Sequence, residues 1–361
     1  MNALFQRIDR VANTRALGRA LLMLVPTYAA ALITGDSLWL QATLVTISVF
    51  IAAEQTRLAP LGVALHGLAT IAGFLILLTA LPFASLFAVL AATMAAGAIL
   101  LTAKGQELRT LGNYTFIPAL YLAIELGEPG SGSGVVRGLA FLPYAVFAIL
   151  PVLALSATEH GRELEPNGRL ISHFHRLRRR GAKLGTAAPC GEAAAAAALA
   201  VVAAALLVEW QHIPHAQWAV WSAASVVTGE VTSARRKLTD RTLGALVGVP
   251  VGVICALVTP NAIALLRLAE IGIVLTLVGF RVYRIGFGAR CACVAFTLAF
   301  AGQWAGAAER VVNVALGGVL GLTFVLAIHA IVMTMKGRPT IAHGDHQPLP
   351  LRVHDCISAG R

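Results

Sequence analysis

The chain has 361 residues, of which 58% are hydrophobic and only 12% are charged. Soluble globular domains carry about 25% charged residues, so this composition excludes that class and indicates a protein embedded in a lipid bilayer. The net charge of +11 does not indicate a nucleic-acid partner, because the basic residues fall in short gaps between apolar runs, where they meet anionic lipid headgroups.

The apolar runs are long enough to predict membrane-spanning helices. A helix needs about 20 mostly apolar residues to cross the roughly 30 Å hydrocarbon core of a bilayer. The first half of the chain offers six runs, at 16–34, 38–53, 58–80, 83–103, 111–126 and 136–157. The second half offers six more, at 192–208, 217–231, 242–259, 263–280, 286–303 and 311–333. We therefore predict an all-α integral membrane protein with about twelve transmembrane helices.

The basic residues flank these runs asymmetrically. All of the 28 Lys and Arg residues except Arg137, Arg267 and Arg310 fall on one side of the implied membrane. Because Lys and Arg accumulate on the cytoplasmic side of a membrane, this pattern predicts that both termini lie in the cytoplasm.

The runs and gaps divide the chain into four segments. We expect residues 1–157 to form a first six-helix repeat and residues 191–335 a second. Residues 158–190 between them are polar and basic, which predicts a cytoplasmic linker that touches lipid headgroups. Residues 336–361, with three prolines, are expected to form a disordered cytoplasmic tail.

The two halves share residues at equivalent places. An alignment that sets Trp39 on Trp218 also sets Arg57 on Arg236, Gly73 on Gly252 and, after small gaps, Arg137 beside Arg310. Six helices per repeat is an even number, so both repeats run in the same direction through the membrane. Parallel repeats of this kind occur in transporters, whose substrate sites lie between the halves.

Ionisable groups at membrane depth are costly and tend to face a cavity. Arg137 and Arg310 are cations on the external side at equivalent positions of the two repeats, so we expect them to bind an anionic substrate. The alternative is that they form structural pairs with Glu125 and Glu309.

Two tryptophans and two acids complete the candidate site. Trp39 and Trp218 are expected at the external membrane interface, where amphipathic rings favour the headgroup level, and beside the substrate. Glu125 and Glu230 are candidates for exchanging a coupling proton, although either acid could simply mark the end of a helix.

The remaining motifs indicate packing rather than catalysis. Gly244, Gly248 and Gly252 are spaced by four, which predicts close approach of one helix to a neighbour. The chain has no phosphate-binding loop and no combination of nucleophile, base and acid. His212 and His215 are weak zinc candidates. We therefore expect no enzyme activity, no cofactor and no bound metal.

One stretch resembles a known family. Residues 217–231 begin Q-W-A-V-W, and residues 235–248 read R-R-K-L-T-D-R-T-L-G-A-L-V-G. This pattern resembles the repeat signature of the fusaric acid resistance and aromatic acid exporter family. The matching positions are Trp218, Ala219, Val220, Arg235, Arg236, Arg241, Gly244 and Gly248. The segment from Glu309 to Gly318 resembles the family's final arginine and glycine span, and the first half matches more faintly.

The resemblance implies a bacterial inner-membrane protein that exports aromatic or other organic acids with energy from the proton gradient. We therefore expect a secondary transporter whose partners are membrane lipids and a small organic anion. A periplasmic adaptor or a second copy of the chain is a further partner that the family suggests. The alternatives left open are a channel-like organic anion pore, as in plant malate channels, and a non-transporting membrane scaffold.

Overall fold

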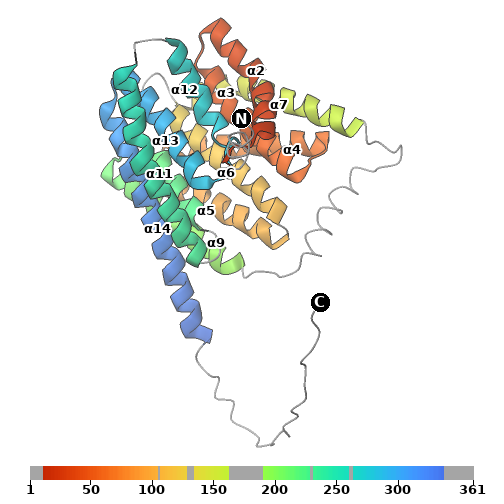
Figure 1. Cartoon of the computed structure of the whole chain (residues 1–361). Coiled ribbons are helices and arrows are strands. Elements are labelled where there is room, and N and C mark those ends of the chain that lie inside the picture. Colours follow the sequence, from red (N-terminus) through yellow and green to blue (C-terminus); the bar gives the residue numbers. More distant parts are fainter. Residues whose placement is uncertain are drawn as a thin grey trace, which may run out of the picture.

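The computed structural model describes residues 11–104, 106–127, 134–161, 190–227, 231–259 and 263–336. Over these residues the chain forms twelve α-helices and one short 3₁₀ helix, which gather into a single bundle (Figure 1). Most of the expected linker, residues 162–189, and the expected tail from residue 337 lie outside the described residues.

The helices correspond one for one to the twelve apolar runs. Those of the first half are α2 (Thr14–Thr34), α3 (Leu38–Thr56), α4 (Pro60–Ala80), α5 (Ala84–Leu100), α6 (Gln106–Gly127) and α7 (Gly134–Gly161), with the 3₁₀ helix η1 (Leu101–Lys104) before α6. Those of the second half are α9 (Cys190–Gln211), α10 (Ala216–Val226), α11 (Val231–Val258), α12 (Ile263–Leu275), α13 (Tyr283–Phe300) and α14 (Trp304–Lys336). The prediction of an all-α chain is confirmed.

Local residue chemistry sets several helix ends. The side chain of Asn13 accepts a hydrogen bond from the backbone N–H of Ala16 and so caps α2 at its first turn. Gly35 ends α2 with a φ of 69°, the left-handed conformation that glycine adopts without strain. Pro60 opens α4, where its fixed φ suits the first turn and its missing N–H is not needed.

Seven of the helices are long and apolar enough to cross a membrane: α2, α3, α4, α7, α9, α11 and α14. By contrast, α10 has 11 residues and α12 has 13. At 1.5 Å per residue these helices are about 17 and 20 Å long, shorter than the roughly 30 Å of hydrocarbon. By length and composition, seven of the described helices qualify as membrane spans, whereas the sequence predicted about twelve.

The outside of the bundle is apolar. Large aliphatic side chains such as Leu32, Val247 and Leu257 are 57%, 64% and 66% exposed. A soluble monomer rarely exposes continuous apolar surface of this kind. The exterior is therefore suited to lipid chains rather than to water.

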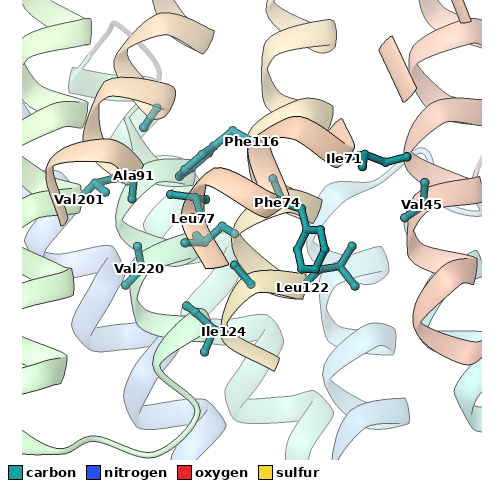
Figure 2. Packing of buried hydrophobic residues seen from close by; sticks show 14 of the residues in the cluster. Val45, Ile71, Phe74, Leu77, Ala91, Phe116, Leu122, Ile124, Val201 and Val220 are labelled. Carbon is teal, nitrogen blue, oxygen red and sulfur yellow. The ribbon is translucent and has the colours of Figure 1, made fainter. Parts of the chain in front are cut away.

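The two halves meet where α5 packs against α9. Both helices bury mainly small side chains, including Ala91 and Ala95 on α5 and Ala197 and Ala200 on α9. Figure 2 shows Ala91 close to this seam, with Val201 and Val220 of the second half nearby. Small side chains allow two helix backbones to approach closely, and this explains the alanine-rich start of α9.

Helix pairings recur between the halves. In the first half α3 packs on α7, α4 on both α6 and α7, and α5 on α6. In the second half the helices at the same places in chain order pair in the same way: α10 with α14, α11 with both α13 and α14, and α12 with α13. Contacts between the two halves also correspond. The fourth helix of the first half, α5, packs on the first helix of the second half, α9, and the fourth helix of the second half, α12, makes a smaller contact with the first helix of the first half, α2.

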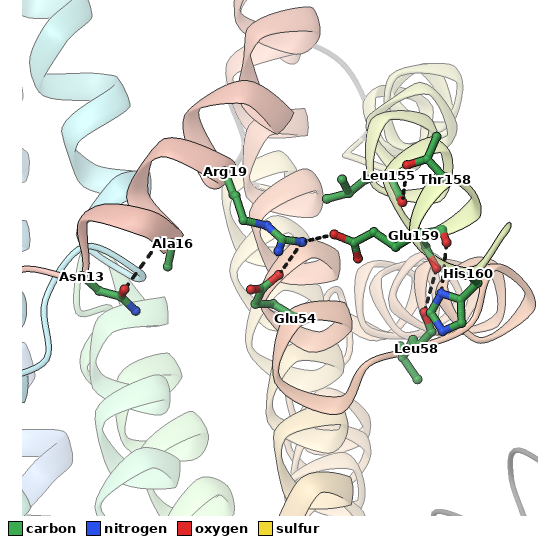
Figure 3. Close-up of polar contacts among 10 residues, drawn as sticks. Asn13, Ala16, Arg19, Glu54, Leu58, Leu155, Thr158, Glu159 and His160 are labelled. Carbon is green, nitrogen blue, oxygen red and sulfur yellow. Dashed lines mark hydrogen bonds and ion pairs between the residues drawn. The ribbon is translucent and has the colours of Figure 1, made fainter. Parts of the chain in front are cut away.

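An ion-pair network ties three helices of the first half together at one end of the bundle. Nη2 of Arg19, on α2, lies 2.9 Å from Oε2 of Glu54 and 2.6 Å from Oε1 of Glu159 (Figure 3). Beside it, the Ser156 hydroxyl donates a hydrogen bond of 2.7 Å to the carbonyl oxygen of Leu58. Through these contacts α3 and α7 are held to α2.

The segment before α2 contacts the connection between α12 and α13. The backbone N–H of Arg281 donates to the carbonyl oxygen of Val11 at 2.8 Å, and that of Asn13 donates to the carbonyl oxygen of Gly279 at 2.9 Å. Ala12 and Phe280 thereby form an isolated antiparallel bridge. The bridge fixes the turn that ends α12 several residues earlier than its hydropathy predicts.

Candidate functional site

A cavity of about 550 Å³ lies between the two halves. Its walls come from α2, α3 and α6 of the first half and from α10 to α14 of the second. Its volume is in the range of sites that hold small organic molecules. Both short helices, α10 and α12, contribute to the wall.

Three buried arginines line the cavity. Arg241 on α11, Arg290 on α13 and Arg310 on α14 are 2%, 9% and 3% exposed. A permanently charged side chain is costly to bury in a bundle surrounded by lipid unless something compensates its charge. The groups around these three arginines therefore determine how their charge is stabilised.

Aromatic rings accompany each arginine. The guanidinium carbon of Arg241 lies 4.4 Å from the centroid of the Phe287 ring, and that of Arg310 lies 4.8 Å from the Trp218 ring. Arg290 lies at 5.9 Å from Trp221 and 6.0 Å from Phe287. A cation over a ring face is attracted by the ring quadrupole, which stabilises the arginines in part but does not neutralise them.

The hydrogen-bond partners of the arginines are neutral groups. Arg241 donates through Nη1 to the Tyr283 hydroxyl at 3.0 Å, and Arg290 donates through Nε to the Thr276 hydroxyl at 3.2 Å. Arg310 donates through Nε to the thiol sulfur of Cys291 at 3.4 Å.

Within the described part of the chain, these three arginines form no ion pair with a carboxylate. Nε of Arg241 is buried and has no hydrogen-bond partner there. An anionic ligand would supply both the missing charge and the missing acceptor.

The charge balance of the wall is positive. Lys237 adds a fourth basic side chain, and the acids on the wall are Glu125 and Glu270. Glu270 is already paired with Arg267, whose Nη1 lies 2.9 Å from its Oε2. Glu125 accepts a 3.2 Å hydrogen bond from Nε2 of Gln217, a contact that joins α6 of the first half to α10 of the second. The cavity therefore attracts anions.

One neutral acceptor in the wall also lacks a partner. Gln217 is 1% exposed, and its Oε1 is buried without a hydrogen bond among the described residues. Because its Nε2 donates to the carboxylate of Glu125, the orientation of the amide is settled and Oε1 must face elsewhere. A ligand hydroxyl or a water molecule could donate to it.

Of the residues expected from the sequence, Arg310, Trp218 and Glu125 line the cavity. Arg137, on α7, and Trp39, on α3, are not among the lining residues. The Trp39 ring packs instead against Tyr144 and Phe147 on α7, with centroids 4.7 and 5.1 Å apart.

The other acids expected from the sequence are Glu230 and Glu309. Glu230 lies outside the described residues. Glu309, the expected structural partner of an arginine, has its Oε2 3.8 Å from Nε2 of His215.

The three expected packing glycines lie where α11 meets α13. A Cβ atom built on Gly248 would lie 2.2 Å from the carbonyl oxygen of Gly288, and one on Gly252 would lie 2.1 Å from the carbonyl oxygen of Ala292. One on Gly244 would lie 3.0 Å from Cδ1 of Phe287. This close approach brings Arg241 of α11 and the aromatic face of α13 together.

Sequence reasoning missed Lys237, Arg241 and Arg290 as cavity residues. It attributed them to membrane orientation because they belong to basic clusters. The spacing of these residues along their helices could have identified them. Lys237 and Arg241 are four residues apart on α11 and therefore share one face of that helix. In the same way, Phe287 and Arg290 are three residues apart and share one face of α13. Arg235 and Arg236, in the same cluster, are exposed instead.

A family model described as fusaric acid resistance protein-like matches residues 201–324. The matched segment runs from α9 into α14 and includes all three buried arginines. Searches of curated proteins and of solved structures gave no match. The resemblance drawn from the second half of the sequence is thereby confirmed, and the apolar helices make the chain a multi-pass membrane protein.

Proposed function

We propose that this multi-pass membrane protein, fusaric acid resistance protein-like over residues 201–324, is a secondary transporter that exports small organic anions from a bacterial cell, with aromatic acids as one class. The observation that carries the proposal is the cavity wall, in which three buried arginines face aromatic rings and find no carboxylate among the described residues. An organic acid matches both features, because its carboxylate neutralises guanidinium groups and its apolar part stacks on the rings.

The short helices support a transport role. Transporters often build their substrate sites from interrupted helices near the middle of the membrane, where irregular backbone is tolerated if it lines a cavity. Here α10 and α12 are too short to span alone, and both contribute side chains to the cavity.

We further propose that twelve membrane helices form two parallel six-helix repeats. The helix pairings that recur between the halves support this arrangement, as does the cavity between the halves. The alanine-rich contact of α5 with α9 would hold the halves together on one side. The sparser contact of α12 with α2 and α3, beside the cavity, would let them separate on the other.

In this arrangement both termini and the linker lie in the cytoplasm of a bacterial inner-membrane protein. Reporter domains that fluoresce only in the cytoplasm, inserted at residue 170 and fused to the carboxyl terminus, are expected to fluoresce at both places. A periplasm-active reporter should be active in the loop between α9 and α10. Fluorescence at only one of the two cytoplasmic positions would contradict an even number of spans between them.

Proton coupling is assigned to Glu125 and Glu230. Of these, Glu125 is placed where protonation can affect the contact between the halves. It lines the cavity, and its carboxylate accepts a hydrogen bond from Gln217 of the other half. Protonation of Glu125 would remove the negative charge that strengthens this hydrogen bond and would so favour separation of the halves. Proton and organic anion would then act on the same interface.

Purified protein in proteoliposomes tests the function directly. We expect radiolabelled benzoate and hydroxybenzoates to accumulate against their gradients when a proton gradient is imposed, and to lose that accumulation when a protonophore is added. An anion current that reverses at the anion equilibrium potential would show that the protein is a pore and not a secondary transporter. Absence of any protein-dependent flux from the chain alone, and again after addition of periplasmic extract, would overturn the proposal and favour a scaffold.

A further inference from the structure

The cationic wall of the cavity is divided into two subsites. The double-arginine subsite consists of Arg241 and Arg290 with the rings of Trp221 and Phe287, since each arginine lies within 6.0 Å of both ring centroids. The single-arginine subsite consists of Arg310 over the ring of Trp218.

The helix that carries both tryptophans sets the separation of the subsites. Trp218 and Trp221 are three residues apart on α10, so their Cα atoms are separated by about 4.5 Å along the helix axis. Both side chains lie on the cavity wall, on one face of the helix. The two subsites are thus neighbours on the wall of one cavity.

A single carboxylate cannot compensate the charge of both subsites. Arg241, Arg290 and Arg310 carry three permanent positive charges, whereas the acids on the wall are Glu125 and Glu270, and Glu270 is held by Arg267. A monoanion at the double-arginine subsite would leave Arg310 with only the Trp218 ring and the Cys291 sulfur as partners. Leaving a buried cation uncompensated is costly.

We propose that the cavity selects organic dianions, with one acidic group at each subsite and an apolar or aromatic body between the rings of Trp218 and Trp221. This inference rests on the proposed function and makes it more specific, because it states the charge of the substrate and the two subsites that bind its acidic groups. Affinity should rise with the second acidic group even when the carbon skeleton is unchanged.

The test compares ligands of matched skeleton on the purified full chain in lipid nanodiscs. Isothermal titration calorimetry at neutral pH would use butanedioate against butanoate, and benzene-1,4-dicarboxylate against benzoate. In at least one pair the dianion is expected to bind about tenfold or more tightly than the monoanion, as charge-assisted contacts at a second subsite require. Equal or weaker binding of both dianions would overturn the inference and leave organic-anion transport standing. Binding of none of the four ligands would overturn the proposed function as well.

Variants separate the subsites. Arg310→Gln is expected to reduce the advantage of the dianion to within about twofold, while the monoanion keeps its affinity at the double-arginine subsite. Arg310→Lys keeps the charge and should keep most of the advantage. Arg235→Gln, exposed on α11 and absent from the cavity wall, is the matched control and should change neither ligand. A tenfold advantage that survives in Arg310→Gln would contradict the assignment of the second subsite. If that variant does not fold, the ligand pairs on the natural chain still decide the question.

Discussion

Replacing Arg290 by glutamine is expected to lower transport of organic anions by at least tenfold and to leave the thermal stability of the protein unchanged or higher. Arg290 is buried, and its partners among the described residues are the Thr276 hydroxyl and two rings near the limit of cation–π contact. Its charge therefore contributes little to folding, whereas a charge-assisted hydrogen bond to a substrate carboxylate contributes about 1.5–3 kcal/mol, or ten- to a hundredfold in binding.

The opposite signs of these two effects make the measurement informative. Transport of labelled organic acid into proteoliposomes and the thermal unfolding temperature would be measured on the same preparations. A residue that served only the structure would show the reverse pattern, with a lowered unfolding temperature and transport reduced only in proportion to the folded fraction. Arg235→Gln removes an exposed arginine from α11 and should leave both quantities at their natural values.

Replacing Gly248 by leucine is expected to prevent stable assembly of the second half. The first side-chain atom would lie 2.2 Å from the backbone oxygen of Gly288, far inside any tolerated contact, and a backbone atom cannot rotate away as a side chain can. The helices α11 and α13 would have to separate along their whole contact. Overpacking costs about 1–3 kcal/mol where neighbours can adjust, and this contact allows little adjustment.

Size-exclusion chromatography of a fluorescent fusion in detergent measures the effect. The Gly248→Leu protein should elute mainly as aggregate or unfold at a temperature at least about 10 °C lower, whereas Gly248→Ala should shift in the same direction by less. Gly97 on α5 is the matched control, because a Cβ built there meets no atom within 4 Å. Gly97→Ala should be neutral or mildly stabilising, by up to about 1 kcal/mol. A Gly248→Leu protein that elutes and melts like the natural chain would refute the packing role.

The elements of the fold that depend on local pattern could be predicted from the sequence. Twelve apolar runs predicted the twelve helices of the described residues, because hydropathy over 11 to 33 residues is a local property. The end of α12 could not be predicted. Residues Leu277, Val278 and Phe280 are as apolar as a helix requires, and the chain turns there through backbone hydrogen bonds to Val11 and Asn13, more than 250 positions away.

The cavity was predictable only in part. Arg310 and Trp218 were found because each stands out from its surroundings, one as a cation on the external side and the other as an aromatic anchor. Arg241 and Arg290 belong to basic clusters that orientation alone explains, so their burial depends on the packing of α11 against α13. The alignment of the two halves assigns Arg137 and Arg310 to equivalent positions, and a binding role for Arg137 stays a prediction.

The shortness of α10 and α12 has an electrical consequence. In the proposed transporter both helices line the cavity without crossing the roughly 30 Å hydrocarbon core, so the bound anion would lie within the membrane and its transport would cross the membrane voltage. With the cell interior negative, outward movement of each negative charge gains about 2.3 kcal/mol per 100 mV, and a doubly charged solute gains twice as much.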